Sequence, residues 1–283
     1  MGRIYAVINQ KGGVGKSTTA ATLAAGLSLK GYKTLSIDLD AQGNLSYTAG
    51  AKTDGATALG VLTGEVPIKD AIQKTESGDI IASSKALAGA DAFISDTGKE
   101  YRLKEALEAV QADYDYIVLD TPPALGILTI NALTACNSVI IPAQADIYSL
   151  QGIEQLADTM KPVKKYCNPA LTIEGILLTR YSPRSVLSKE VAELAGQLAA
   201  KLGTKLFKAT IREAIAVKEA QISQQTLYSY APKAKVTADY TSFINELLGC
   251  NTDGIEQSIQ AQIEEDLDIE KHIEAEIKAS LPY

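Results

Sequence analysis

The stretch QKGGVGKST, from Gln10 to Thr18, decides the fold of this 283-residue chain. It follows an apolar, β-branched run, Ile4–Ile8, and opens a helical pattern, Thr18–Leu29. Between a strand and a helix, glycines let backbone N–H groups curl round an anion, and the helix dipole adds partial positive charge. Lys16 can reach terminal phosphates, and the Ser17 hydroxyl is suited to Mg²⁺. The stretch therefore predicts a phosphate loop that binds a nucleotide.

One position of this loop departs from the common pattern GxxxxGKS/T. The pattern expects glycine five residues before Gly15, but Gln10 stands there and a second lysine, Lys11, follows it. Glycine-rich stretches also form plain strand-to-helix turns, yet here the lysine, the hydroxyl and both flanking elements coincide. We therefore expect phosphate contacts from Gly12, Gly13, Val14, Gly15, Lys16, Ser17 and Thr18.

The composition is that of an ordinary globular protein, with 46% hydrophobic and 22% charged residues. No apolar run approaches the roughly 18 residues of a membrane span, and no basic and apolar leader precedes the first strand, so no membrane partner is expected. The three cysteines, Cys136, Cys167 and Cys250, lack metal-ligand spacing, which favours a reduced, cytoplasmic setting. The single histidine, His272, lies in a charged segment, so histidine-based catalysis is not expected.

The net charge of −7 lies entirely within residues 251–283, which hold nine acidic residues against Lys271 and Lys278. Residues 1–250 carry 25 acidic and 25 basic residues, so the acidic total does not exclude a nucleic-acid partner. Isoleucine or leucine recurs every fourth residue through most of 251–283, which predicts an acidic amphipathic helical tail after one domain, 1–250. The tail either packs on its own domain or a second copy, or binds a separate partner.

Short β-rich runs alternate with helical patterns along the rest of the chain. The expected strands are Ile4–Ile8, Thr34–Ile37, Ile80–Ala82, Tyr116–Leu119, Ser138–Pro142, Thr172–Leu178 and Lys205–Phe207. The expected helices are Thr18–Leu29, Lys99–Gln111, Leu150–Tyr166 and Ser188–Leu202. Apolar runs separated by helices are typical of parallel sheets with right-handed crossovers. The fold class is therefore α/β: a doubly wound, mostly parallel sheet flanked by helices, with the rest of residues 51–98 forming helices and loops beside it.

Three carboxylates stand at the ends of two expected strands: Asp38 and Asp40 follow Thr34–Ile37, and Asp120 follows Tyr116–Leu119. In doubly wound sheets, ligands bind outside the carboxyl ends of the strands. Asp120 fits the aspartate that holds Mg²⁺ in phosphoryl-transfer sites, and Asp40 is then free to orient the attacking water. Single aspartates at strand ends often only form turns. Two such ends in a chain with a phosphate loop favour metal and water chemistry.

Four segments together resemble one protein family. They are QKGGVGKST, SIDLDAQGN, YDYIVLDTPPALGILTINALTA and VIIPAQADIYSLQGIEQL, and the likeness spans residues 2–248. The chain resembles the ParA/Soj group of the ParA–MinD family of deviant Walker-A ATPases. The resemblance implies slow ATP hydrolysis, ATP and Mg²⁺ as cofactors, and a sandwich homodimer when ATP is bound. A cation supplied across such an interface stabilises the charge that develops in phosphoryl transfer, and the resemblance gives this role to Lys11.

The resemblance also implies roles for single residues. The implied catalytic residues are Lys11, Lys16 and Asp40. The implied metal site consists of Ser17, Asp38 and Asp120. The adenine-contacting segment of the family corresponds to Ile211–Ala214, which reads IREA and lacks the family's proline and asparagine. Its Arg212, together with Arg180 after the strand Thr172–Leu178, is expected beside the nucleotide.

ParA-type proteins bind DNA without sequence preference as ATP dimers, so the resemblance implies a basic surface in the C-terminal third of the chain. Such binding needs Lys or Arg side chains that neutralise phosphates on one face, and no base readout. The candidate residues are Arg184, Lys218, Lys233 and Lys235. A ParB-like centromere-binding partner is implied to stimulate hydrolysis, and a nucleoid-associated location in the cytoplasm is implied by the DNA binding.

An alternative of a different class is a MinD-like positioning ATPase that acts on a membrane or a polar scaffold. Interfacial membrane helices carry Lys and Arg to meet anionic lipid, whereas the polar face of residues 251–283 is acidic. The sequence therefore favours DNA partitioning. It leaves the cargo open between a plasmid, a chromosome, a mobile element and a protein cluster.

Overall fold

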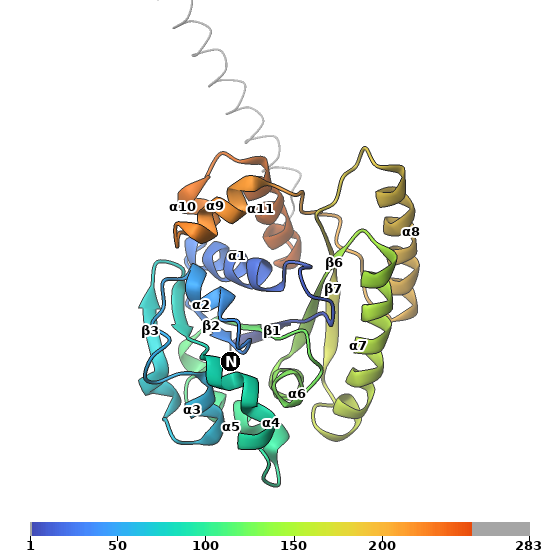
Figure 1. Ribbon diagram of the computed structural model, residues 1–283. Coiled ribbons are helices and arrows are strands. Elements are labelled where there is room, and N and C mark those ends of the chain that lie inside the picture. The colour runs from blue at the N-terminus through green and yellow to red at the C-terminus, as the bar shows by residue number, and fades with distance from the viewer. Residues whose placement is uncertain (1, 251–283) are drawn as a thin grey trace, which may run out of the picture. The chain divides into compact units, whose positions relative to one another are not determined.

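A seven-stranded sheet organises the fold in the computed structural model, which describes residues 2–250 (Figure 1). The strand order is β3-β4-β2-β5-β1-β6-β7, and each neighbouring pair is parallel except β3 with β4. The strands are β1 (Arg3–Val7), β2 (Thr34–Asp38), β3 (Ile72–Thr75), β4 (Gly78–Ile81), β5 (Tyr116–Asp120), β6 (Ser138–Gln144) and β7 (Thr172–Thr179).

Helices cover both faces of this sheet. Figure 1 shows α1 on one face and α4, α5 and α6 on the other. The α-helices are α1 (Lys16–Leu29), α2 (Asn44–Thr48), α3 (Ala58–Thr63), α4 (Ala90–Phe93), α5 (Arg102–Glu108), α6 (Ile127–Ala135), α7 (Ile147–Tyr166), α8 (Val186–Lys201), α9 (Ile215–Ile222), α10 (Leu227–Tyr230) and α11 (Lys235–Leu247). The 3₁₀ helices are η1 (Ile68–Ala71), η2 (Lys85–Gly89), η3 (Lys99–Tyr101) and η4 (Gln111–Asp113). The predicted doubly wound, mostly parallel sheet flanked by helices is confirmed.

The central strands are buried on both faces, which explains their continuous apolar sequence. In β1, every residue from Ile4 to Val7 is at most 3% exposed, and β2 is buried throughout. Strands covered by helices on both sides have no polar face, so the apolar run, rather than an alternating pattern, predicts them. The helices that connect the parallel strands supply this cover.

Strand register brings the carboxyl ends of β1, β2 and β5 together. Asp120 at the end of β5 pairs with Val7 of β1 on one side and with Asp38 of β2 on the other. Because parallel strands end at one edge of a sheet, the loop after β1 and the carboxylates after β2 and β5 share that edge. The edge is the location that the sequence predicts for ligand binding.

The sequence prediction missed one strand and overstated two elements. Residues 51–98 contribute β3 as well as the predicted β4, joined by a tight turn that ends at Gly78, the first residue of β4, which has a φ of 104°. Strand β3 lies at the sheet edge and reads IQKT, without the apolar run that marks the central strands. The expected strand Lys205–Phe207 is only an isolated bridge. The expected helix Lys99–Gln111 begins with the 3₁₀ turn η3, a common form of helix terminus.

The first compact unit of the chain comprises residues 1–244, and a second unit begins at Asn245. The predicted tail, residues 251–283, lies outside the described residues. Within residues 2–250, no helix is both long enough and apolar enough to cross a membrane.

Candidate functional site

The loop between β1 and α1 has the backbone geometry of an anion cradle. Gly13 and Gly15 adopt left-handed conformations, with φ of 76° and 88°, which residues with side chains rarely adopt. Gly15 directly precedes α1, so the free N–H groups of the helix N-terminus open into the loop. A Cβ atom at Gly12 or Gly13 would meet no atom within 4 Å, because both glycines line an open cavity.

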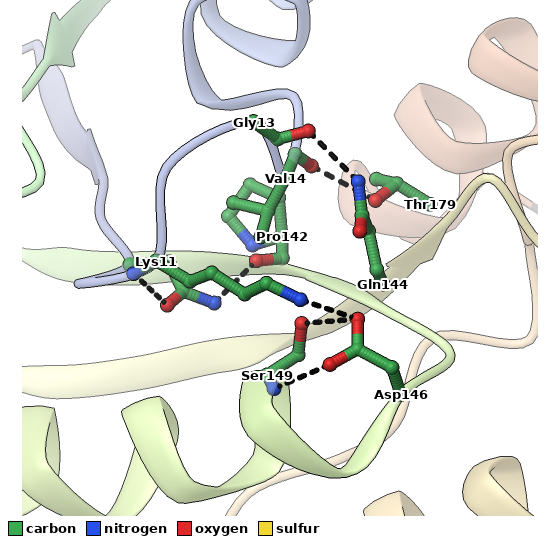
Figure 2. Close-up of polar contacts among 9 residues, drawn as sticks. Lys11, Gly13, Val14, Pro142, Gln144, Asp146, Ser149 and Thr179 are labelled. Atoms are coloured by element: carbon green, nitrogen blue, oxygen red, sulfur yellow. Dashed lines mark hydrogen bonds and ion pairs between the residues drawn. The ribbon is translucent and has the colours of Figure 1, made fainter.

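Side chains at the ends of β6 and β7 hold the carbonyl groups of this loop (Figure 2). The Thr179 hydroxyl donates to the carbonyl oxygen of Val14 at 2.8 Å, and the Gln144 amide donates to that of Gly13 at 2.9 Å. In a trans peptide, a C=O group and the N–H group of the next residue point in opposite directions. With these carbonyls turned toward the sheet, the N–H groups that follow them remain for a ligand.

Asn9 fixes the start of the loop. Its side chain is fully buried, and its amide donates to the carbonyl oxygen of Pro142 in β6 at 2.7 Å. The Asn9 side-chain oxygen accepts the N–H of Lys11 at 3.0 Å. The loop is therefore anchored to the sheet from its first residues as well as through Gly13 and Val14.

Two adjoining cavities open beside the loop. The larger, of about 580 Å³, is lined by the loop glycines and by Lys16 and Asp40. The smaller, of about 140 Å³, has an apolar wall formed by Val14, Ile211, Val217 and Tyr240. Both cavities are lined by Gly15, Thr18, Arg180, Lys218 and Gln221. A polar cavity joined to a smaller apolar one suits a phosphorylated nucleoside.

Lys16 is a nearly buried cation in the first turn of α1. It is 7% exposed, and its Nζ donates to the carbonyl oxygen of Lys11 at 3.1 Å. Burial lowers the pKa of Lys16, while the carboxylates of Asp120 and Asp40 act in the opposite direction. An ammonium in such a site forms stronger hydrogen bonds to an anion than it would in water. Lys16 can therefore bind a phosphate oxygen at the end of the loop.

Asp120, at the end of β5, is a fully buried carboxylate with few partners. It is 0% exposed, and among the described residues no group forms a hydrogen bond of good geometry with its oxygens, although the Ser17 hydroxyl lies close enough to act as a donor. Burial and Asp38 raise its pKa well above the usual range, whereas Ser17 and Lys16 lower it. An unpaired buried carboxylate is unfavourable unless a cation lies beside it. Mg²⁺ takes oxygen ligands, commonly one or two carboxylates with phosphates and waters, so Asp120 and Ser17 fit this ion.

The two carboxylates at the end of β2 have different surroundings. Asp38 is fully buried and accepts hydrogen bonds from Ser46 and from the N–H of Asp40. Burial raises its pKa to about 6, although these hydrogen bonds favour the charged form. Asp40 is 8% exposed, lines the larger cavity and accepts the N–H of Gln42 at 3.0 Å. Asp40 can therefore face a water molecule in the cavity, while Asp38 is engaged by donors of the protein.

Lys11 pairs with Asp146 at the rim of the loop (Figure 2). The Lys11 Nζ lies 2.6 Å from Asp146 Oδ2, and both side chains are 30% exposed. Asp146 also caps α7 by accepting the N–H of Ser149 at 3.0 Å and its hydroxyl at 3.1 Å. Partial burial acts to raise the pKa of Asp146, but hydrogen bonds from Lys11 and Ser149 hold it below its usual value. Lys11 lines neither of the two cavities.

Two ion pairs border the smaller cavity. Arg212 donates two hydrogen bonds to Asp239, from Nε at 2.6 Å and from Nη2 at 2.7 Å. Arg180 has a left-handed φ of 48°, and its Nε lies 3.9 Å from Glu213 Oε1. The guanidinium of Arg212 is therefore already occupied by a carboxylate, and its contact with a base remains a prediction.

The basic residues predicted for DNA binding do not share one environment. Lys218 lines both cavities beside the phosphate loop. Arg184 is exposed between β7 and α8, and Lys233 and Lys235 are exposed around the start of α11. The DNA contacts of these residues remain predictions, and Lys218 is the one that lies beside the nucleotide cavity.

Four residues that hold the loop or its rim were not predicted from the sequence: Asn9, Gln144, Asp146 and Thr179. Gln144 and Thr179 end strands β6 and β7, and Asp146 is the second residue after β6. In the sequence, the signal for a functional strand end was a charged residue after an apolar run. The amide of Gln144 and the hydroxyl of Thr179 do not give this signal. For Asp146, the spacing to Ser149 was an available signal, since an Asp before a helical pattern is an N-cap candidate.

An anion cradle with a buried lysine, at the same sheet edge as an unpaired buried carboxylate, is the arrangement that P-loop ATPases use for phosphoryl transfer. Within this class of ATPases, the second lysine of the loop, Lys11, distinguishes a smaller group of proteins.

Comparison of this chain with known families, proteins and solved structures identifies the group. The family model described as "AAA domain" matches residues 2–173. The sporulation initiation inhibitor protein Soj of Bacillus subtilis is 39% identical over 87% of this chain and 98% of its own length. The chromosome partitioning protein ParA of Caulobacter vibrioides is 38% identical over 89% of this chain and 96% of its own length. A crystal structure of cobyrinic acid a,c-diamide synthase from Mycobacterium smegmatis, with bound ADP and magnesium, has a TM-score of 0.76 and 33% identity, covering 90% of this chain and 97% of that one.

The chain belongs to the ParA/Soj family of P-loop ATPases. It is an ATPase, and the ATPases of this family use ATP and Mg²⁺. The family that the sequence resembles is thereby confirmed.

Proposed function

We propose that this chain is an ATP-dependent DNA-partitioning protein. ATP with Mg²⁺ drives a sandwich homodimer, the dimer binds DNA without sequence preference, and a ParB-like centromere-binding partner stimulates slow hydrolysis. Similarity to the partitioning protein ParA supports this function. The observation that carries the proposal is the second loop lysine, Lys11, held at the rim of the loop by Asp146.

Within one subunit, hydrolysis uses the residues at the sheet edge. Lys16 neutralises the terminal phosphates, and Ser17 with Asp120 holds Mg²⁺. Apart from the nearby Ser17 hydroxyl, the oxygens of Asp120 have no hydrogen-bond donor among the described residues, which supports their use as ligands of the ion. Asp40 lines the cavity and orients the attacking water. Asp38 supports Asp40 by accepting a hydrogen bond from its backbone N–H.

Lys11 acts on the nucleotide of the partner subunit. Its pair with Asp146 is partly exposed, and such pairs contribute only about 0–1 kcal/mol. Exchange of one carboxylate for a phosphate that carries several charges is therefore favourable. Lys11 leaves Asp146 when a second copy brings its ATP to the loop, which makes formation of the homodimer depend on bound ATP.

The DNA-binding surface consists of Lys233 and Lys235, with Arg184 as a further contact. All three are exposed, as contacts to phosphates require. Each contact between a lysine and a DNA phosphate releases counterions, so the affinity falls steeply with salt and does not depend on sequence. Lys218 lines the nucleotide cavity, so its substitution changes ATP binding as well as DNA binding.

Three variants test separate steps of the proposal. Lys11→Ala should bind ATP but remain monomeric and fail to bind DNA. The double variant Lys233→Glu/Lys235→Glu should dimerise with ATP and fail to bind DNA. The matched control is Lys104→Glu/Lys164→Glu, which reverses two exposed charges on α5 and α7 and should still dimerise and bind DNA. Size-exclusion chromatography with a slowly hydrolysed ATP analogue and gel shifts over a salt series provide the measurements.

Each step of the proposal is contradicted by a different experimental result. Dimers of Lys11→Ala with ATP would contradict the role of Lys11. DNA binding by the wild type that ignores ATP and salt would contradict the DNA switch. Co-sedimentation with anionic lipid vesicles in the presence of ATP, without DNA binding, would favour the MinD-like alternative.

A further inference from the structure

A closed cycle of hydrogen bonds joins Asp38, Asp40, Ser46 and Ser83, and we call it the hydroxyl ring. The Ser83 hydroxyl donates to the carbonyl oxygen of Asp40 at 2.5 Å, and the N–H of Ser83 donates to the Ser46 hydroxyl at 2.9 Å. Ser46 donates in turn to Asp38 Oδ2, from its hydroxyl at 2.7 Å and from its N–H at 2.8 Å. Asp38 closes the ring by accepting the N–H of Asp40 on Oδ1 at 3.1 Å.

Three segments of the chain meet in the hydroxyl ring. Asp38 ends β2, Ser46 lies in α2, and Ser83 follows β4, the strand beside β2. Asp38, Ser46 and Ser83 are each 0% exposed. Buried polar groups that all have partners form a rigid network, whereas one missing partner leaves another group unsatisfied. The ring therefore fixes the ends of two strands and one helix relative to one another.

The hydroxyl ring holds the backbone of Asp40 and leaves its carboxylate for the cavity. Both polar groups of the Asp40 backbone are engaged, its N–H by Asp38 and its C=O by the Ser83 hydroxyl and by the N–H of Gly43 at 2.8 Å. The carboxylate accepts the N–H of Gln42 and lines the larger cavity. Because the backbone sets the direction in which the Asp40 side chain leaves the chain, the ring limits where its carboxylate can lie at the cavity wall, and the N–H of Gln42 orients the carboxylate there.

We propose that Ser83 and Ser46 are positioning residues that hold Asp40 for ATP hydrolysis. The proposal rests on the proposed role of Asp40 in orienting the attacking water. Reacting groups must lie about 3–3.5 Å apart, and a displacement of about 1 Å lowers rates by about 100-fold. The hydrogen bonds of the ring involve none of the phosphate-loop residues 10–18. Loss of the Ser83 or Ser46 hydroxyl should therefore lower the rate of hydrolysis more than the affinity for ATP.

The test compares two buried serines. Ser83→Ala removes the side-chain donor to the Asp40 carbonyl and leaves the N–H of Gly43 as its remaining donor. The matched control, Ser138→Ala, removes a hydroxyl that is 1% exposed at the amino end of β6, where it bonds to Glu174 at 3.1 Å. Ser83→Ala should lower the single-turnover rate of ATP hydrolysis about 10-fold to 100-fold. Its Kd for ATP should stay within about two-fold of wild type, and Ser138→Ala should change neither quantity.

Ser46→Ala breaks the ring at a second point and should show the same division between rate and affinity; it provides the test if Ser83→Ala does not fold. Hydrolysis rates equal to that of Ser138→Ala, or a raised Kd with an unchanged rate, would overturn the positioning role. Asp40→Ala separates this inference from the proposed function. It should dimerise with ATP and fail to hydrolyse it, and normal hydrolysis by this variant would overturn the role of Asp40 itself.

Discussion

The two adjoining cavities beside the loop are built differently. We call the larger one, expected to hold the phosphates, the phosphate end, and the smaller one, expected to hold the base, the base end. At the phosphate end, Thr179 and Gln144 hold carbonyl groups of the loop, and Lys16 is only 7% exposed. At the base end, around the smaller cavity, the Arg212 side chain is 47% exposed and pairs with Asp239, and that of Arg180, which lines both cavities, is 50% exposed and pairs with Glu213. The phosphate end is held by anchors from β6 and β7 before a ligand binds, of which the one from Thr179 is buried, whereas the base end is formed by exposed side chains that can change partners.

The difference follows from what each end has to recognise. A phosphate is bound largely by backbone N–H groups, whose directions change only if the chain moves, so the loop needs buried anchors. A base presents a flat apolar face and a few polar atoms, which side chains can meet in more than one arrangement. Substitutions at the phosphate end should therefore have large effects on ATP binding, and substitutions at the base end should have small ones.

The largest effect is expected for Lys16→Ala. The variant removes a buried cation that faces the carboxylates of Asp40 and Asp120. Hydrogen bonds to charged groups contribute about 1.5–3 kcal/mol each, so ATP affinity and hydrolysis should fall by about 100-fold or more. Calorimetric titration with ATP and Mg²⁺ and a steady-state phosphate-release assay measure the two quantities.

The control is Lys30→Ala, which removes an exposed lysine at the other end of α1 and should bind ATP like the wild type. A Kd for Lys16→Ala within about three-fold of wild type would contradict the central place given to the phosphate end.

An intermediate effect is expected for Thr179→Val, which tests whether the loop has to be held. Valine has nearly the shape of threonine but cannot donate to the carbonyl oxygen of Val14. An unsatisfied buried acceptor costs about 1–3 kcal/mol, so ATP affinity should fall by about ten-fold.

The matched control is Thr172→Val at the other end of β7, where the hydroxyl is exposed and bonds at 3.3 Å to the carbonyl oxygen of Asn137. Equal ATP affinities for the two valine variants, measured by the same titration, would mean that the loop keeps its geometry without its anchor.

The phosphate end was largely predictable from sequence because its residues are contiguous or stand at strand ends. One stretch, Gln10–Thr18, supplies the loop, and the rule that ligands bind at carboxyl ends of parallel strands brings Asp40 and Asp120 to it. The register of β1, β2 and β5 confirms this juxtaposition. No pattern within a single segment indicated Thr179, because this residue binds no ligand itself. It holds the loop through its hydrogen bond to the carbonyl oxygen of Val14.

The base end and the hydroxyl ring could not be predicted, because each is assembled from residues far apart in the chain. Arg212 meets Asp239 across 27 positions, and Ser46 meets Ser83 across 37. Serines carry no charge and have no required spacing, so only the folded chain brings Ser83 to Asp40. Arg212 stood at the position that the family resemblance favoured for a base contact, but the sequence could not indicate that a carboxylate already occupies its guanidinium.

The smallest effect on ATP binding is expected at the base end, for Arg212→Ala. Its side chain is 47% exposed, but it forms two hydrogen bonds to Asp239, which is only 12% exposed, so the value of about 0–1 kcal/mol typical of exposed pairs does not apply. The free energy of unfolding should therefore fall by about 1–3 kcal/mol, whereas the Kd for ATP should change by less than about three-fold, because Asp239 and not the ligand holds the guanidinium; denaturant titration and calorimetry measure these quantities. Asp239→Asn is the matched control, because it keeps Arg212 and removes its charged partner.

An affinity loss of about ten-fold in Arg212→Ala alone would mean that Arg212 leaves Asp239 for the nucleotide. The phosphate end and the base end would then differ in the partners that their side chains have before ATP binds, and not in their rigidity.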